Sequence, residues 1–188
     1  MQDIVSQARR NGMISTGIDL FLAAVLAVFK VIGLASGGMF LIVSGIFIAL
    51  ICFSVIYRLR ALRKISMLSG IKAAALYRNC VIVCICVIAI TSIFLSIPLS
   101  ISHKHLAMIL CILIAFTGAI YIAVAWFCIN FALARVSGVG IFETYVWICV
   151  ILFPLNALYH LIFPITLTIT SIVHLLAWSK IEKISVKV

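Results

Sequence analysis

Polar side chains recur once per helical turn in an otherwise apolar segment near the end of the chain. Thr166, Thr170 and His174 follow one another at intervals of four residues, a spacing that places all three on one face of a helix. Because histidine exchanges protons near neutral pH and intramembrane polar groups commonly mark pathways, this stripe is a candidate substrate or proton path. The alternative is structural, since a threonine in a membrane helix often donates a hydrogen bond to the carbonyl four residues earlier.

Three more polar residues are expected at the depth of His174. Asp19, Asn130 and Glu143 each lie within a few residues of one end of an apolar segment, within about 8 Å of the membrane boundary at about 1.5 Å of helix rise per residue. A nearby carboxylate favours the charged imidazolium. We therefore predict that Asp19 or Glu143 pairs with His174 as a cytoplasmic proton site. The alternative is a neutral histidine bonded to a carbonyl or a threonine.

A stripe of small residues follows another apolar segment. Ala115, Ala119 and Ala123 repeat at every fourth position, and Asn130 continues the same phase. Small side chains at this spacing allow two membrane helices to approach closely. The three alanines are therefore the predicted helix-packing residues, either within the chain or against a partner.

The elements that position these residues must be membrane helices. Of the 188 residues, 66% are hydrophobic and only 10% are charged, and the mean hydropathy is +1.40. Ordinary soluble domains are about half apolar and about a quarter charged. The composition thus excludes a soluble enzyme, a disordered chain and a nucleic-acid-binding domain. Because the apolar runs are continuous and about twenty residues long, they indicate spanning helices and not barrel strands.

Six such runs are present, and we expect an all-α, polytopic membrane protein that forms a single transmembrane domain over residues 1–188. The polar residues 58–78 are expected to form the one substantial loop, and 103–105 a short polar turn. The predicted spans are about 15–35, 38–57, 80–102, 106–133, 141–159 and 161–179.

The basic residues orient these spans. The chain has 14 Lys and Arg against 4 Asp and Glu, a net charge of +10. With six spans, 12 basic residues fall on one side and only Lys104 on the other, while Lys30 lies inside the first span. The 12 are Arg9, Arg10, Arg58, Arg60, Arg63, Lys64, Lys72, Arg78, Arg135, Lys180, Lys183 and Lys187. Basic residues concentrate in cytoplasmic loops, so we predict three antiparallel hairpins with both termini in the cytoplasm.

No pattern in the sequence indicates catalysis. It lacks a glycine-rich phosphate loop, a zinc-protease helix motif and a nucleophile motif. The seven cysteines lie in or at the start of apolar runs, where cysteine packs as a small hydrophobe. A metal site made of His103, His105 and His160 is unfavourable, because Lys104 lies between the first two and no carboxylate accompanies them. We expect no enzyme activity, no cofactor and no metal site.

Residues 21–51, which read FLAAVLAVFKVIGLASGGMFLIVSGIFIALI, resemble the first hairpin of cation diffusion facilitators. The matching positions are Lys30, Gly33, Ser36, Gly37, Leu41, Ile42 and Gly45. Members of that family have six spans and cytoplasmic termini, and the resemblance implies a hairpin scaffold and dimerisation for this chain. It does not carry metal transport, because the family's ligand positions fall on Phe47 and Ile51 and its preceding aspartate on Ser44, and because zinc requires nitrogen, oxygen or sulfur ligands.

Two functions from different classes fit these features. The first is a transporter or transport-related protein of the cell membrane for an unidentified solute or ion, with its polar layers lining a path. The second is a non-transporting accessory or immunity-type protein that uses its small-residue face to bind a membrane partner. The expected partners are the lipid bilayer and a second copy or another membrane protein, with no nucleic acid.

Overall fold

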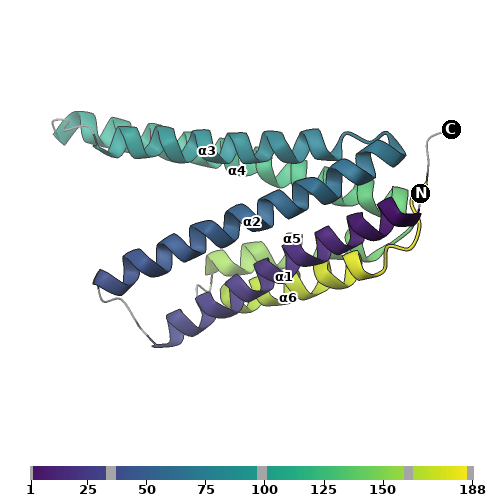
Figure 1. Cartoon of the computed structure of the whole chain (residues 1–188). Helices are drawn as coiled ribbons and strands as arrows, with labels where there is room; N and C mark the ends of the chain where they lie inside the picture. Colours follow the sequence, from purple (N-terminus) through teal and green to yellow (C-terminus); the bar gives the residue numbers. More distant parts are fainter. Residues whose placement is uncertain (1, 33–36, 97–100, 159–162, 186–188) are drawn as a thin grey trace. The chain divides into compact units, whose positions relative to one another are not determined.

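The described part of the chain is helical throughout, with short connections between helices. The computed structural model describes residues 2–32, 37–96, 101–158 and 163–185, and no strand occurs within them. The helices are α1 (Gln2–Ile32), α2 (Gly37–Ser69), α3 (Ala73–Ser96), α4 (Ile101–Ser137), α5 (Ile141–Leu158) and α6 (Phe163–Ser179) (Figure 1). The predicted all-α class is confirmed.

Three stretches of the described helices are long and apolar enough to cross a membrane, namely Gly45–Ser69 in α2, Ala73–Phe94 in α3 and His105–Ser137 in α4. Two shorter apolar stretches, Ile141–Leu152 and Phe163–Ser179, belong to α5 and α6. An apolar helix needs about 20 residues to cross the hydrocarbon layer. These helices have the length and composition of a membrane protein.

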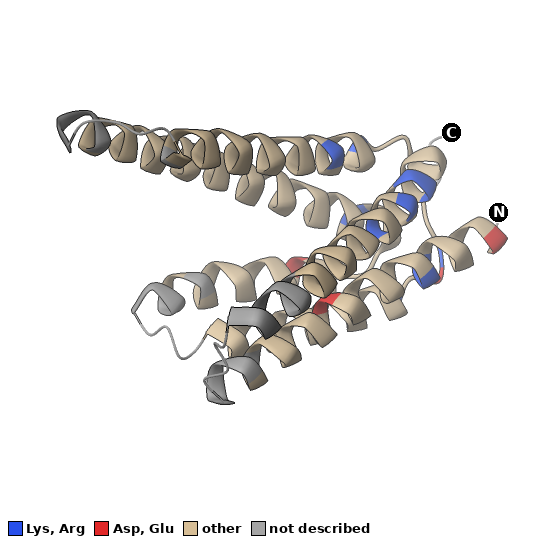
Figure 2. Ribbon diagram, turned by 60° about the vertical axis from the view of Figure 1, so that its left-hand side comes forward, with Lys and Arg blue, Asp and Glu red and all other residues tan. Residues whose placement is uncertain are grey.

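The predicted loop over residues 58–78 is wrong, because α2 continues to Ser69 and α3 begins at Ala73. Ala61, Leu62 and Ile65 lie at helical spacing and are at most 1% exposed, whereas Arg60 and Arg63 are exposed. This part of α2 is therefore an amphipathic helix. In α2 the Lys and Arg residues are confined to the C-terminal half (Figure 2). Arg58, the first charged residue after the apolar run, marks the end of that run but not the end of the helix.

The other predicted boundaries change for the same reason. Helix α1 begins at Gln2 and not near residue 15, and its buried Val5 and Ala8 continue the face that Ser15 and Thr16 occupy. Helix α4 begins at Ile101, so residues 103–105 belong to its first turn and not to a separate turn. Polar residues that extend a helix beyond an apolar run cannot be distinguished from a loop by hydropathy alone.

Two serine–glycine pairs end long helices in the same way. Gly70 and Gly138 have φ angles of 71° and 67°, the left-handed conformation that glycine adopts without steric cost. Their N–H groups donate to the carbonyls of Ser66 and Ala134, each at 2.9 Å. These bonds satisfy carbonyls that the helix end would otherwise leave unpaired. Both connections are consequently only three residues long.

The chain divides into two compact units. Unit 1 comprises residues 1–71 and 130–188, and unit 2 comprises residues 72–129. In unit 1, α1 packs against both α2 and α6, and α5 packs against α6 (Figure 1). Unit 2 contains α3 and most of α4, which run side by side.

The core of unit 1 is built around Trp178 of α6, which is 1% exposed, and Phe142 of α5, which is fully buried. The two rings meet edge to face, with centroids 5.6 Å apart. Helix α1 approaches this core at Gly12, where a Cβ atom would lie only 2.1 Å from two Trp178 ring carbons. The absence of a side chain at Gly12 therefore permits the close packing of α1 on α6.

Candidate functional site

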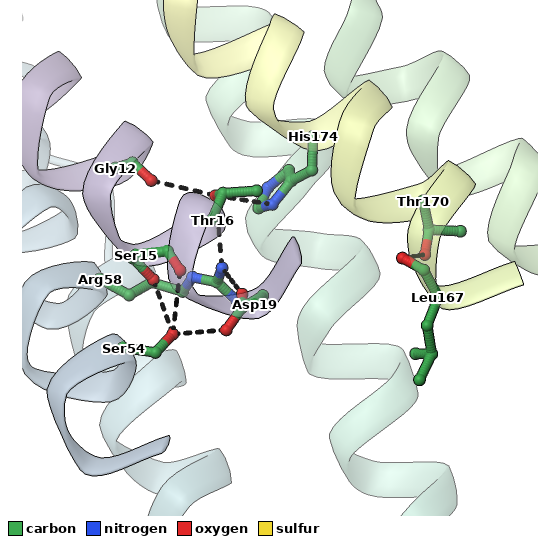
Figure 3. A network of polar contacts seen from close by, with 9 residues as sticks. All are labelled: Gly12, Ser15, Thr16, Asp19, Ser54, Arg58, Leu167, Thr170 and His174. Carbon is green, nitrogen blue, oxygen red and sulfur yellow. Dashed lines mark hydrogen bonds and ion pairs between the residues drawn. The ribbon is translucent and has the colours of Figure 1, made fainter. Parts of the chain in front are cut away.

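A cluster of polar side chains lies inside unit 1, on the faces that α1, α2 and α6 turn toward one another (Figure 3). Helix α1 contributes Ser15, Thr16 and Asp19, and α2 contributes Ser54 and Arg58. On each helix the outer two of these residues are four positions apart, so they share a face. Ser15, Thr16, Ser54 and Arg58 are all buried, at 9% exposure or less.

The α1–α2 half of the cluster is a buried ion pair supported by hydroxyl groups. Arg58 Nη2 pairs with Asp19 Oδ2, while Ser54 Oγ donates to Asp19 Oδ1 at 2.6 Å. The Ser15 and Ser54 hydroxyl oxygens are 3.0 Å apart. Because a hydroxyl donates only one hydrogen, Ser15 donates to Ser54 when Ser54 donates to Asp19. Both carboxylate oxygens of Asp19 are thus held by α2.

The α1–α6 half of the cluster connects this ion pair with His174 through Thr16. The Thr16 hydroxyl donates to the Gly12 carbonyl at 3.0 Å and accepts from Arg58 Nη2 at 3.4 Å. His174 Nδ1 lies 3.4 Å from the same hydroxyl oxygen. Since the Thr16 hydrogen is used toward Gly12, we assign the His174 tautomer with its proton on Nδ1, which donates to Thr16.

Aromatic side chains of α5 and α6 hold the His174 ring in position. Its ring stacks on Tyr145 with centroids 4.5 Å apart and an interplanar angle of 24°. The edges of Phe142 and Trp178 meet it at 5.8 and 6.1 Å. His174 is only 3% exposed. An imidazole enclosed on several sides has a fixed orientation, which a binding or relay group requires.

A cavity of about 270 Å³ opens beside the cluster. Its polar lining consists of Thr16, Asp19, Arg58, Tyr145, Thr170, Ser171 and His174, and its apolar lining of Leu22, Ala23, Leu26 and Leu167. The side chains of Asp19 and Arg58 are 31% and 11% exposed, so the carboxylate is the more accessible of the two charges. A concave site with a few convergent polar groups is the usual form of a small-molecule site.

The structure brings together only part of the predicted set. His174, Asp19 and Thr170 line the cavity. Thr166 and Asn130 are buried, at 1% and 0% exposure, but neither is among the residues that line it.

Glu143 is exposed in the first turn of α5, where a carboxylate interacts favourably with the helix dipole. The predicted histidine–carboxylate pair is replaced by a different arrangement. The carboxylate of Asp19 pairs with Arg58, and His174 contacts Thr16. The alternative of a histidine bonded to a threonine therefore describes this contact.

Thr170 makes the hydrogen bond within its own helix that the structural alternative for the threonine stripe predicts. The Thr170 hydroxyl donates to the carbonyl of Thr166 at 2.8 Å (Figure 3), as threonine commonly does inside a helix. Its oxygen retains lone pairs with which it can accept a further hydrogen bond. Thr170 can therefore both stabilise α6 and contact a ligand in the cavity.

Sequence reasoning missed Arg58, Thr16, Ser54 and Tyr145. The hydropathy pattern places Arg58 in a loop, because a charge after an apolar run usually marks the membrane boundary. One signal could have found it: Ser15 and Asp19 are four residues apart, as are Ser54 and Arg58. Such matched pairs at the same depth on two neighbouring helices predict a polar contact.

The alanine stripe occupies a different environment from the one expected for packing within the chain. Ala115, Ala119 and Ala123 are all exposed on α4. The close approach within unit 2 occurs at Gly118, where a Cβ atom would lie 2.7 Å from Val87 Cγ2. A role of the alanines in binding a partner stays a prediction.

Among the described residues, no group of three or more His, Cys, Asp and Glu side chains is arranged to hold a metal ion. Phe47 and Ile51, which occupy the ligand positions of the cation diffusion facilitator motif, both lie in α2, and Ile51 is 49% exposed. His103 and His160 lie outside the side chains that the structure describes. No protein-family model, curated protein or solved structure matches the chain.

Proposed function

We propose that this chain is a six-span protein of the cytoplasmic membrane, with both termini in the cytoplasm, that binds and transports a small polar solute. The observation that carries this proposal is the cavity in unit 1, where Asp19, Arg58 and His174 meet at one polar wall. Charged side chains inside membrane helices are costly and commonly mark solute or ion paths. No metal ligand occupies the positions of Phe47 and Ile51, so the proposal excludes the mechanism of cation diffusion facilitators.

The chemistry of the site also favours binding of a polar solute. The Asp19–Arg58 pair offers one acceptor group and one donor group, and the Thr16 and Thr170 hydroxyls add further hydrogen-bonding positions. These groups come from three different helices of unit 1. A relative shift of α1 against α2 or α6 would therefore change the binding geometry, as the conformational cycle of a transporter requires.

The proposed topology is tested by labelling single cysteines on a cysteine-free background. A cysteine at position 70, between α2 and α3, is expected to react with an impermeant maleimide only after the cells are permeabilised. A cysteine at position 104 is expected to react in intact cells. Reaction at position 70 in intact cells would overturn the orientation.

The proposed transport is tested in proteoliposomes with a panel of radiolabelled solutes: amino acids, carboxylates, amines, sugars and inorganic ions. Uptake of at least one solute above that of protein-free liposomes is expected. Arg58→Gln should abolish this uptake, and His174→Gln should change its dependence on pH. The control is Arg63→Gln, which removes an exposed arginine from the same helix. Equal uptake with and without protein across the whole panel would contradict the proposal.

A second function is favoured by the exposed alanines on α4. Ala115, Ala119 and Ala123 form an exposed small-residue face, whereas the close approach to Val87 is made at Gly118. We infer from it an accessory or immunity-type protein that binds a second copy or another membrane protein. If so, Ala119→Leu should weaken cross-linking between chains, whereas Phe116→Leu, at an exposed position outside the stripe, should leave it unchanged.

A further inference from the structure

The cavity of unit 1 changes in chemistry along its length. On α1 its lining residues progress from Thr16 and Asp19 to Leu22 and Leu26, and on α6 from His174 to Leu167. Both helices therefore present polar groups at one end and apolar groups at the other. A ligand that fills the whole cavity must have a polar head and an apolar body. A purely polar solute would leave the leucine end unfilled or hydrated.

The polar end carries one charge of each sign. A cationic ligand binds Asp19 in competition with Arg58, and an anionic ligand binds Arg58 in competition with Asp19. Either ligand would separate a mostly buried ion pair and leave one of its members without its counterion, which is strongly unfavourable. A zwitterionic head avoids this cost, because its ammonium replaces Arg58 beside Asp19 while its carboxylate replaces Asp19 beside Arg58.

The volume limits the size of this ligand. The cavity volume of about 270 Å³ lies just below the range of about 300 to 1,000 Å³ that is typical of small-molecule sites. The ligand is thus a single small molecule and not a membrane lipid with full acyl chains. L-leucine, with its branched apolar side chain, is of a suitable size.

Building on the proposed function, we propose that the cavity binds a small zwitterion with an apolar side chain, the chemistry of an aliphatic amino acid. The ammonium binds Asp19, and the carboxylate binds Arg58. The aliphatic group lies along Leu22, Leu26 and Leu167. His174 positions Thr16, which holds Arg58 from the side of α1.

The proposal is tested with four probes that separate the head from the body. L-leucine has both, isoamylamine lacks the carboxylate, 4-methylpentanoate lacks the ammonium, and glycine lacks the apolar group. Each is added to the full chain in nanodiscs, and thermal unfolding is followed. At a concentration ten times its Kd, L-leucine should raise the unfolding midpoint by about 3 °C, whereas the other probes at that concentration should produce little change.

Variants of this chain locate the binding. Arg58→Gln and Asp19→Asn should each abolish the leucine shift. Gly17→Ala should retain it, because a Cβ atom there meets nothing within 4 Å. Leu26→Trp enlarges a cavity residue that is 40% exposed, so the variant is expected to fold and to lose the leucine shift. It keeps the proposal testable if the charge variants do not fold.

The outcomes distinguish this inference from the proposed function. The zwitterion proposal would be overturned if isoamylamine or 4-methylpentanoate shifted the unfolding midpoint as much as leucine does, or if leucine caused no shift. In each case uptake of another panel solute would leave the transport function standing. A leucine shift that Arg58→Gln and Leu26→Trp remove, without any leucine uptake, would support the binding site and contradict transport of leucine.

Discussion

Two cavities in this protein differ in what lines them. The cavity of unit 1 is bordered by an ion pair, a histidine and several hydroxyl groups. The cavity of unit 2, about 490 Å³, is a more open groove bordered by apolar side chains of α3 and α4, with Thr117 and Tyr121 as its polar members. Both units are helical and apolar, so composition alone does not distinguish them. The difference arises from which helix faces are buried.

The polar cluster of unit 1 depends on close contacts between its helices. Polar groups that are removed from water need hydrogen-bonding or ionic partners, because unsatisfied polar groups are expensive at low dielectric. Unit 1 meets this need by close helix contact at Gly12 and by the buried aromatic core around Trp178. Exposed isoleucines of α3, such as Ile85 and Ile88, have no such requirement and can be covered by lipid.

The largest expected effect breaks the packing of unit 1. Gly12→Ala places a methyl group 2.1 Å from two carbons of the buried Trp178 ring. We expect a loss of about 3 kcal/mol in unfolding free energy, because overpacking of a filled core costs about 1 to 3 kcal/mol. Reversible unfolding in detergent, by denaturant titration, measures it.

The matched control is Gly17→Ala on the same helix, where the added atom meets nothing within 4 Å. It should gain up to about 1 kcal/mol from helix propensity. Equal stability of the two variants would show that α1 does not pack on α6 at Gly12.

The next effect tests the ion pair. Arg58→Met leaves the Asp19 carboxylate without its cationic partner. Removal of one member of a buried pair costs about 3 to 5 kcal/mol, and because the Asp19 side chain is 31% exposed we expect a smaller loss of about 2 kcal/mol. Chemical unfolding of the single variants and of Arg58→Met with Asp19→Asn provides a double-mutant cycle.

Non-additive losses in this cycle are the expected result. Arg63→Met should change stability by no more than about 0.5 kcal/mol, because Arg63 is exposed on the same helix. If Arg58→Met behaved like Arg63→Met, the ion pair would contribute nothing to unit 1.

The smallest effect belongs to unit 2. Gly118→Ala places a Cβ atom 2.7 Å from Val87 Cγ2, a single methyl group of a cavity-lining side chain. A net loss of about 1 kcal/mol is expected, measured by thermal unfolding against Gly45→Ala, whose Cβ atom meets nothing within 4 Å. Addition of Val87→Ala to Gly118→Ala should remove the clash. A loss equal to that of Gly12→Ala would mean that unit 2 is packed as tightly as unit 1.

Part of the candidate site could be predicted from local patterns. Helical periodicity placed Thr170 and His174 on one helix face. The distance of Asp19 from the end of its apolar run predicted that it lies at a similar membrane depth. Both rules depend only on helix geometry along a single segment. Neither tells which helices are neighbours. For this reason Asp19 is one of two carboxylates predicted to pair with His174, whereas in the structure it pairs with Arg58.

The sequence by itself determined the helical class, the apolar segments and the polar residues near the ends of these segments, because hydropathy and periodicity are properties of each segment. Only the tertiary structure decided that α2 extends to Ser69, that α1 packs between α2 and α6, and that Arg58 and Thr16 complete the site. These features depend on contacts between segments distant in the chain. Gly12 against Trp178 shows the reason: a glycine has no pattern of its own, and its importance comes from the ring that lies against it.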